Sequence, residues 1–138
     1  MNRLARLLLL SLLGFVLVAC GASPTKQNPL DKLLASYASA IRWSEFDEAV
    51  EFVDPKVRQA QPLTDLERER LKQIQVTSYE VKRKRVAPDG AIEQVVEIRL
   101  IGRNTQIERM VTDHQVWRWD EASKQFWLTS GLPDFTAK

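Results

Sequence analysis

The stretch IEQVVEIRLI, residues 92–101, decides the fold of this chain. Its alternating pattern predicts a β-strand with one buried face, because successive strand residues point to opposite sides of a sheet. The buried face would carry Ile92, Val96, Ile98 and Leu100. Turn-forming triplets flank the stretch, with Pro88-Asp89-Gly90 before it and Gly102-Arg103-Asn104 after it. We therefore expect an antiparallel neighbour on each side.

Three further strands are expected around this one, at 74–86, 105–119 and 125–130. The alternation is irregular in 105–119. There Ile107, Val111, Trp117 and Trp119 share a face with Arg109 and Asp113. A bulge in the middle of the strand and a polar pocket both explain this pattern, and the residues alone do not separate them.

Three helices are expected before the strands. Asn28 as a cap and Pro29 in the first turn begin a helix that runs to about residue 41. Its apolar stripe consists of Leu30, Leu33, Leu34, Tyr37, Ala38 and Ile41. Ser44 opens a second, short helix that ends at Asp54-Pro55, and a loop is expected at 59–62. Thr64 and Glu67 have the spacing of a capping box and start a third helix to about Lys72.

Helices followed by an antiparallel meander predict a single α+β domain over residues 29–138, with the helices packed on one face of a four-stranded sheet. This order resembles the cystatin-like family, and more narrowly the nuclear transport factor two-like α+β cone, over about residues 29–135. The resemblance implies a curved sheet. It implies no particular activity, because such domains include enzymes and binding proteins.

The N-terminal segment has the pattern of a secretory signal. Basic residues at Arg3 and Arg6 precede an uncharged apolar run over 7–18, which is too short to span a bilayer comfortably. Leu17-Val18-Ala19-Cys20 resembles the bacterial lipoprotein box. The resemblance implies cleavage between Ala19 and Cys20 and a lipid such as palmitate on the Cys20 thiol. An ordinary signal peptide with a chance cysteine, or an uncleaved anchor helix, are the alternatives.

These features divide the chain into a signal peptide (1–19), a lipidated tether (20–28) and the α+β domain (29–138). The protein would face the periplasm, anchored in the membrane by its lipid. In the best-known sorting rule an Asp after the lipidated Cys retains a lipoprotein in the inner membrane. Gly21 stands there instead, which favours the outer membrane.

Charge and cysteine content narrow the function classes. The chain has 20 basic and 18 acidic residues, and loss of Arg3 and Arg6 with the signal would leave 18 of each. This balance argues against nucleic acid as a partner. Cys20 is the only cysteine, so a lipid there would leave no thiol for a disulfide, a catalytic nucleophile or a metal site.

The most conspicuous charged cluster is Lys82-Arg83-Lys84-Arg85, which we call the basic run. It is a candidate patch for an anionic partner such as a lipid headgroup or an envelope polymer. It also suits a solvated strand at the edge of a sheet, where Lys and Arg prevent aggregation. Glu93, Glu97 and Glu108 are expected on neighbouring strands and could pair with it.

A possible pocket involves Asp113, His114 and Trp117. Asp113 and His114 are neighbours on a strand and would point to opposite faces, so they cannot form a catalytic pair without a bulge. A single His with no free Cys also argues against a typical zinc site. A five-residue turn at 120–124 would place Trp117 opposite Trp127, within an aromatic hairpin that either stiffens the core or forms a ligand wall.

The sequence thus predicts a membrane-anchored lipoprotein of the bacterial cell envelope that acts as a non-catalytic binding or accessory factor. Its partner, an envelope protein or polymer, is not identified, and no cofactor besides the covalent lipid is expected. The alternative is a cone-shaped ligand-binding protein or enzyme whose pocket lies near Asp113 and His114. The two hypotheses differ in whether the interior of the domain binds a ligand or catalyses a reaction.

Overall fold

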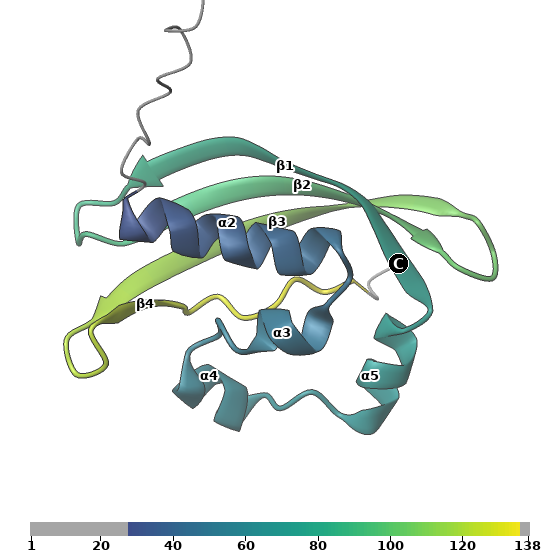
Figure 1. Cartoon of the computed structure of the whole chain (residues 1–138), viewed down its shortest axis with the longest axis horizontal. Coiled ribbons are helices and arrows are strands. Elements are labelled where there is room, and N and C mark those ends of the chain that lie inside the picture. Colours follow the sequence, from purple (N-terminus) through teal and green to yellow (C-terminus); the bar gives the residue numbers. More distant parts are fainter. Residues whose placement is uncertain (1–27, 136–138) are drawn as a thin grey trace, which may run out of the picture.

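A computed structural model describes residues 28–135 of the chain (Figure 1). The helices are α2 (Pro29–Arg42), α3 (Phe46–Val50), α4 (Pro55–Ala60) and α5 (Asp65–Leu71). The strands are β1 (Ile74–Val86), β2 (Ile92–Gly102), β3 (Glu108–Asp120) and β4 (Gln125–Leu128). They form one antiparallel sheet in the order β1-β2-β3-β4. The predicted α+β class and the four-stranded antiparallel sheet are confirmed, and the sheet is open.

Two helix starts have the predicted capping chemistry. The Asn28 side chain accepts a hydrogen bond from the Leu30 backbone N–H at 3.2 Å, with Pro29 in the first turn. Thr64 Oγ1 accepts from the Glu67 N–H at 3.2 Å, and Glu67 Oε2 accepts from the Thr64 N–H at 2.8 Å. These side chains satisfy N–H groups that have no partner within the helix.

Helix α4 corrects the sequence prediction, which treated Asp54-Pro55 as a helix end and 59–62 as loop. Asp54 Oδ1 accepts from the Lys56 N–H at 2.7 Å, and Pro55 occupies the first turn. Asp54 is therefore a second cap of the same kind as Asn28. A proline after a capping residue both ends the preceding helix and begins the next one, and the prediction used only the first effect.

The strand bounds also differ at two places. β3 begins at Glu108 and not at residue 105, because residues 102–107 close a turn in which the Gln106 N–H donates to the Gly102 carbonyl at 2.8 Å. β4 ends at Leu128 and not at residue 130. Leu128 forms a parallel bridge with Val53, so the end of β4 contacts the segment between α3 and α4.

The register of the β3–β4 hairpin is one residue away from the prediction. Asp120 pairs with Gln125, so Trp117 lies opposite Leu128 and Trp127 lies opposite Arg118. The turn therefore has one residue fewer than expected, and a shift of one residue moves every side chain of a strand to the other face. The expected Trp117–Trp127 pair is wrong; the aromatic pair across these strands is Trp119 with Phe126, at 5.3 Å between ring centroids.

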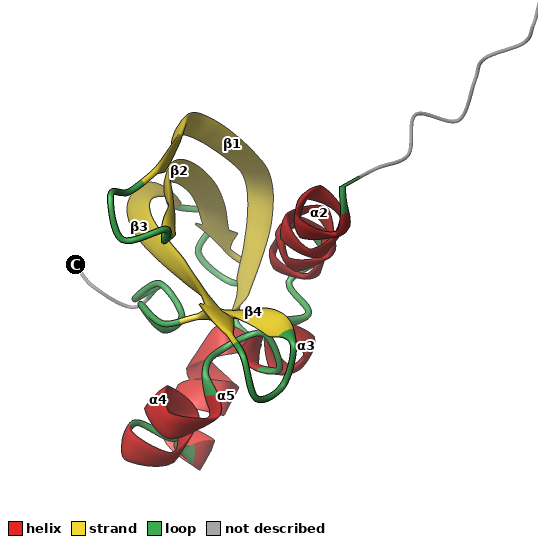
Figure 2. Ribbon diagram, turned by 90° about the vertical axis from the view of Figure 1, so that its left-hand side faces the viewer, coloured by secondary structure: helices red, strands yellow, loops and turns green. Residues whose placement is uncertain are grey.

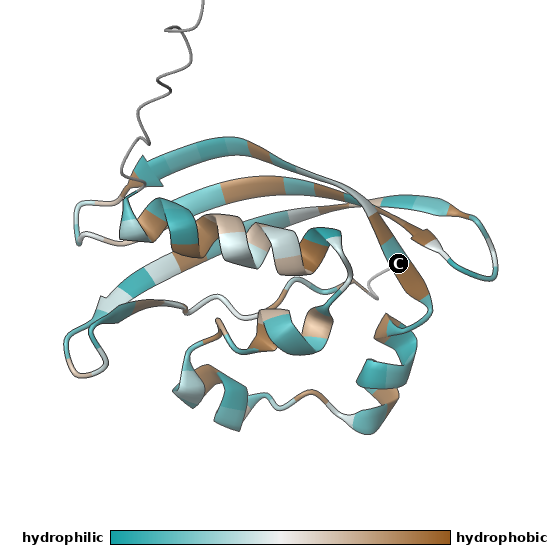
Figure 3. Cartoon of the chain, in the orientation of Figure 1, coloured by the Kyte–Doolittle hydropathy of each residue, from teal (hydrophilic) through white to brown (hydrophobic). Residues whose placement is uncertain are grey.

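Helix α2 runs antiparallel to β1. Asp31 in its first turn forms an ion pair with Lys84 at 2.8 Å, and Ser44, just past its end, accepts a hydrogen bond from the Val76 N–H at 3.0 Å. Figure 2 shows the strongly curved sheet, with α2 beside β1 and the α3–α5 helices grouped below the sheet. The apolar stripe of α2 (Figure 3) supplies Leu34, Tyr37, Ala38 and Ile41 to the core.

The core against α2 consists mainly of β2 side chains. Ile92, Val96, Ile98 and Leu100 are all buried, as predicted, and Trp117 of β3 is fully buried beside them. The Tyr37 ring lies edge-on against Trp117 at 5.1 Å between centroids. Burial of such side chains stabilises a domain by roughly 1.5–3 kcal/mol each.

Candidate functional site

The interior contains a polar cluster, which we call the buried polar cluster: Asp113 and Gln115 of β3, Tyr79 of β1 and Tyr37 of α2. β2 and β3 pair without a register shift from Ile92–Trp117 to Ile101–Glu108. The strand alternation is therefore unbroken, and Asp113, Gln115 and Trp117 share the inner face. Of the two explanations that the sequence left open, a bulge in β3 is excluded and inward-facing polar residues are found.

Gln115 links the members of the buried polar cluster. Its Nε2 donates to Asp113 Oδ2 at 2.7 Å and to the Tyr79 hydroxyl at 3.0 Å. Its Oε1 accepts from Trp117 Nε1 at 3.2 Å. The Tyr37 hydroxyl is buried and has no hydrogen-bond partner in the described part of the chain. The cluster is thus satisfied at its centre and unsatisfied at the Tyr37 hydroxyl.

Burial sets the electrostatics of this cluster. It raises the pKa of Asp113 from 3.8 to about 6, although the hydrogen bond from Gln115 and the charge of His114 act against the shift. Burial also raises the pKa of Tyr79 to about 12 and places that of Tyr37 well above its ordinary value. The Arg42 guanidinium lies 5.5 Å from the Tyr79 ring centre, and its charge acts against the rise in the pKa of Tyr79. A carboxyl group with such a pKa can exchange a proton near neutral pH.

Of the three predicted pocket residues, Asp113 and Trp117 lie together on the inner face of β3, and His114 does not join them. Asp113 is buried, whereas His114 is exposed and points to the opposite face of the sheet, where it pairs in register with Val95. Trp117 is fully buried and donates to Gln115. The sequence argument that Asp113 and His114 face apart is confirmed. Acid–base chemistry would therefore have to come from Asp113 with the two tyrosines, without His114.

The basic run lies on β1, an edge strand of the sheet, and all four side chains are exposed. Lys82 pairs with Glu80 and Glu97, Lys84 with Asp31, and Arg85 with Glu93. Arg83 forms no ion pair with a carboxylate of residues 28–135. A register shift between Val81 and Arg83 breaks the alternation of the strand here.

These contacts test the expected partners of the basic run one by one. Glu93 and Glu97 pair with it as predicted, whereas Glu108 lies 3.6 Å from Arg99 instead. Most of the positive charge is therefore matched by carboxylates of the same domain. The edge-strand interpretation accounts for these contacts without any anionic partner.

The surface has a groove that the sequence did not predict. It has a volume of about 740 Å³ and lies between the α3–α5 segment and the C-terminal residues Ser130–Phe135. Its apolar lining includes Val53, Val57, Leu63, Leu71, Leu132 and Phe135. Gly131, whose φ is +77°, turns the chain from β4 into the wall of the groove. A side chain at that φ is disfavoured, which explains a glycine here.

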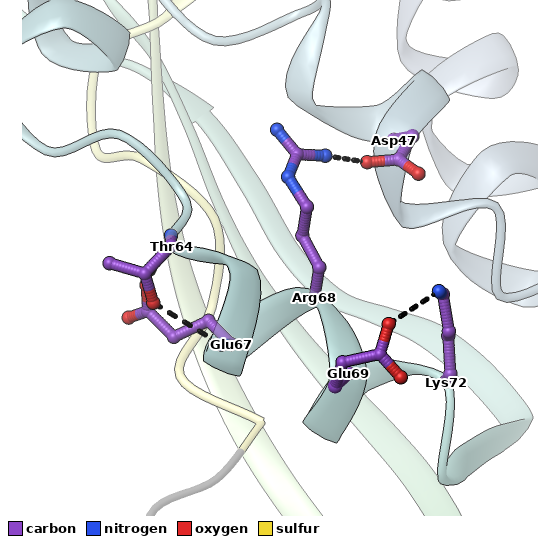
Figure 4. A network of polar contacts seen from close by, with 6 residues as sticks. All are labelled: Asp47, Thr64, Glu67, Arg68, Glu69 and Lys72. Carbon is purple, nitrogen blue, oxygen red and sulfur yellow. Dashed lines mark hydrogen bonds and ion pairs between the residues drawn. The ribbon is translucent and has the colours of Figure 1, made fainter.

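Charged side chains surround this apolar lining. Arg58 and Glu51, both at the groove, form an ion pair at 2.7 Å. Arg68 of α5 also lines the groove, and its guanidinium reaches Asp47 of α3 (Figure 4). Arg68 and Asp47 in addition line a smaller hollow of about 340 Å³ between the start of α3 and α5. Arg68 thus joins α5 to α3 between the two hollows.

Sequence reasoning missed Gln115, Tyr37 and Tyr79 as members of an interior site. Gln115 could have been found from the sequence, since alternate residues of a strand share a face and it lies between Asp113 and Trp117 in that alternation. No local sequence pattern identifies the tyrosines as members of the site, because they come from other elements; Tyr79 and Gln115 are separated by 36 positions in the chain. The groove is assembled from several segments and likewise has no local motif.

The signal peptide with the lipoprotein box at 17–20, and the tether as far as residue 27, lie outside the described residues. Among residues 28–135, no helix is long and apolar enough to cross a membrane. The same residues contain no group of three or more His, Cys, Asp or Glu side chains placed to hold a metal ion.

Comparisons with protein-family models, with curated proteins and with solved structures found no match to this chain. A functional proposal therefore rests on the residues and the geometry of the chain itself.

Proposed function

We propose that this protein is a lipoprotein of the bacterial cell envelope, anchored through Cys20 and facing the periplasm, which binds a partner without catalysing a reaction. The observation that carries the proposal is the Leu17-Val18-Ala19-Cys20 sequence behind a short apolar run. An anchor of two or three acyl chains would hold the protein on the membrane permanently, because one chain alone binds only marginally. The absence of Asp after Cys20 favours the outer membrane.

The groove between α3–α5 and residues 130–135 supports a binding role. It combines an apolar lining with charged groups at Glu51, Arg58 and Arg68, the composition that protein partners use. By contrast, Asp113 is 6% exposed and the buried polar cluster is closed by its own hydrogen bonds. We propose an envelope protein as the partner and the groove as its binding surface.

The finer fold assignment belongs to this proposal. The curved open sheet and a long helix running along it favour the cystatin-like or nuclear transport factor two-like cone. Such cones serve as frameworks for binding as well as for catalysis, so the assignment is compatible with either function.

Lipidation is tested by growing cells with a palmitate analogue and comparing the wild type with Cys20→Ser. The wild type should be labelled and recovered with membranes. Cys20→Ser should be unlabelled and should accumulate as precursor or as a soluble product. Labelling that persists in Cys20→Ser would refute the anchor.

The groove is tested by placing a photo-crosslinking residue at Gln61, an exposed position on the groove. The matched control is Thr112, exposed on β3. Crosslinking in living cells should give a discrete product from position 61 and none from position 112. An identical product from both positions, or no product from position 61, contradicts the groove as the binding surface.

The alternative, a ligand-binding or enzymatic interior, is favoured by one observation, the buried Asp113 carboxyl with a pKa of about 6. A small molecule that depends on this group should be retained by the purified wild-type protein and lost from Asp113→Asn. Native mass spectrometry of both proteins distinguishes this function from groove binding, which Asp113→Asn should leave intact.

A further inference from the structure

Helix α2, which follows the tether, begins beside the basic run. Asn28 caps α2, and Asp31 in the first turn of α2 holds Lys84 at 2.8 Å. Figure 1 shows the start of α2 at the same end of the sheet as the β1–β2 and β3–β4 turns. Arg118 at the end of β3 also holds Asp89 of the β1–β2 turn at 2.7 Å. We call this part of the molecule the tether end.

The tether end must lie close to the membrane if Cys20 carries a lipid, a condition taken from the proposed function. Residues 21–27 separate Cys20 from Asn28, and seven residues span at most about 25 Å. The point at which the domain is attached therefore fixes which of its ends is nearest to the bilayer.

The side chains at the tether end suit a layer of lipid headgroups. Val86 is 68% exposed, and it stands in one row across the sheet with Ile92 and Trp117. Trp119, two residues farther along β3, is 46% exposed and donates its Nε1 proton to Glu121 at 2.8 Å. Exposed Trp with a polar nitrogen is favoured at membrane interfaces. Arg83, the member of the basic run without an ion pair among the described residues, adds a cation there.

The opposite end of α2 provides an internal reference. Trp43 is 76% exposed and is followed by Ser44, which binds the backbone of Val76. Asp31 lies instead at Lys84, eight residues farther along β1. At about 3.3 Å per strand residue, roughly 25 Å separate these two points. The molecule thus carries one exposed Trp near the tether and another far from it.

We infer that the tether end, with Arg83, Val86 and Trp119, rests on the headgroup layer of the membrane that holds Cys20, and that Trp43 points away from it. Because three of the four cations of the basic run already have carboxylate partners, only a small part of the surface is expected to attract anionic headgroups. The lipid tether compensates for this weak attraction, because it raises the effective concentration of the domain at the membrane surface. The contact fixes the orientation of the domain, which a tether alone would leave free.

The test uses the full mature protein, extracted from membranes and reconstituted into vesicles of phosphatidylethanolamine and phosphatidylglycerol whose acyl chains carry bromine atoms near the headgroups. Bromine quenches tryptophan fluorescence at contact distance. The quenched fraction should fall in Trp119→Phe and rise in Trp43→Phe, which loses an unquenched fluorophore. A fall in Trp43→Phe with no change in Trp119→Phe would overturn the inference, as would the absence of quenching in vesicle-bound protein.

A second pair of variants guards against misfolding of the tryptophan variants. Val86→Cys and Leu66→Cys introduce a thiol at positions of similar exposure, 68% and 60%, on β1 and α5. With Cys20 lipidated, each new thiol can be labelled with a polarity-sensitive dye. The dye at position 86 should shift to the blue on reconstitution and the dye at position 66 should not; equal shifts contradict the orientation. Flotation of the protein with the vesicles reports the anchor separately, so loss of flotation refutes the proposed function itself.

Discussion

The basic run on β1 and the buried polar cluster on β3 are the two regions that distinguish an exterior binding role from interior chemistry. In the basic run, charged groups are exposed and three of the four cations have carboxylate partners. In the buried polar cluster, one carboxylate is surrounded by neutral groups and held by Gln115. Exposed ion pairs typically contribute about 0–1 kcal/mol, whereas buried polar groups cost roughly 1–3 kcal/mol each when left unpaired. The cluster that is conspicuous in the sequence is therefore the less important one for stability.

The largest effect is expected from Gln115→Leu. It removes the donor to Asp113 and Tyr79 and the acceptor of Trp117 Nε1, and leaves these groups buried without partners. The free energy of unfolding should fall by about 3–5 kcal/mol, because three buried groups lose their partner and each costs roughly 1–3 kcal/mol when left unpaired. Urea denaturation measures it, with Gln75→Leu on exposed β1 surface as the control. A loss no larger than that of the control would show that Gln115 does not hold the cluster together.

Asp113→Asn tests the buried polar cluster through the pH dependence of the free energy of unfolding. Because the folded pKa of about 6 lies above 3.8, the folded state binds a proton more tightly than the unfolded state. Stability is therefore lost as the pH rises from about 4 to about 6, by roughly 3 kcal/mol in all. Asp113→Asn should abolish this loss and be more stable than the wild type at pH 7.5.

The measurement is urea denaturation of both proteins at pH 4.5 and pH 7.5. The difference between them isolates Asp113 from the exposed carboxylates with a lowered pKa, such as Glu67 and Asp89, whose contributions are lost at low pH. A variant that is less stable than the wild type at both pH values would contradict the proposed cost of burying this carboxylate.

Tyr37→Phe should have a smaller effect, of opposite sign to that of most core substitutions. It removes the buried hydroxyl that has no partner among residues 28–135 and keeps the ring against Trp117. The protein should be stabilised by about 1 kcal/mol, because such a hydroxyl costs roughly that much. Thermal unfolding checks it, with Tyr79→Phe, which loses the hydrogen bonds to Gln115, as the destabilising counterpart.

The smallest effect is expected in the basic run. Arg85→Gln breaks an exposed pair with Glu93 and should leave the urea midpoint within the error of the wild-type value. Charge reversal of Arg83, which lies opposite Val95, should likewise leave stability unchanged. It should also leave the recovery of anionic envelope polymer unchanged in a pulldown, because the patch is largely neutralised. A clear loss of polymer would restore the basic run as a binding site.

The parts of the fold that could be predicted from sequence are those with local causes. The alternation of Ile92, Val96, Ile98 and Leu100 and the caps Asn28 and Thr64 identify their elements within a few residues. Helix α4 was missed because Asp54-Pro55 both ends the preceding helix and begins the next one. The β3–β4 register was missed by one residue, since the length of a turn is not set by the strands it joins.

The candidate sites depend on contacts between distant segments and were harder to predict. The alternation of strand residues predicts that Asp113 shares a face with Trp117. Only the unbroken pairing of β2 with β3 shows that this face is the buried one at Asp113. The tyrosines reach it from α2 and β1, and the groove combines α3–α5 with residues 130–135. No pattern within a single element indicates such an assembly.

The most direct test of the proposed anchor is the intact mass of the protein extracted from membranes of the cells that make it. We predict a chain that begins at Cys20 and carries the added mass of two or three acyl chains, and a fragment spectrum that places this mass on Cys20. A chain that still begins at Met1, or one that begins elsewhere without lipid, would contradict the anchor on which the proposed function and the orientation of the domain both depend.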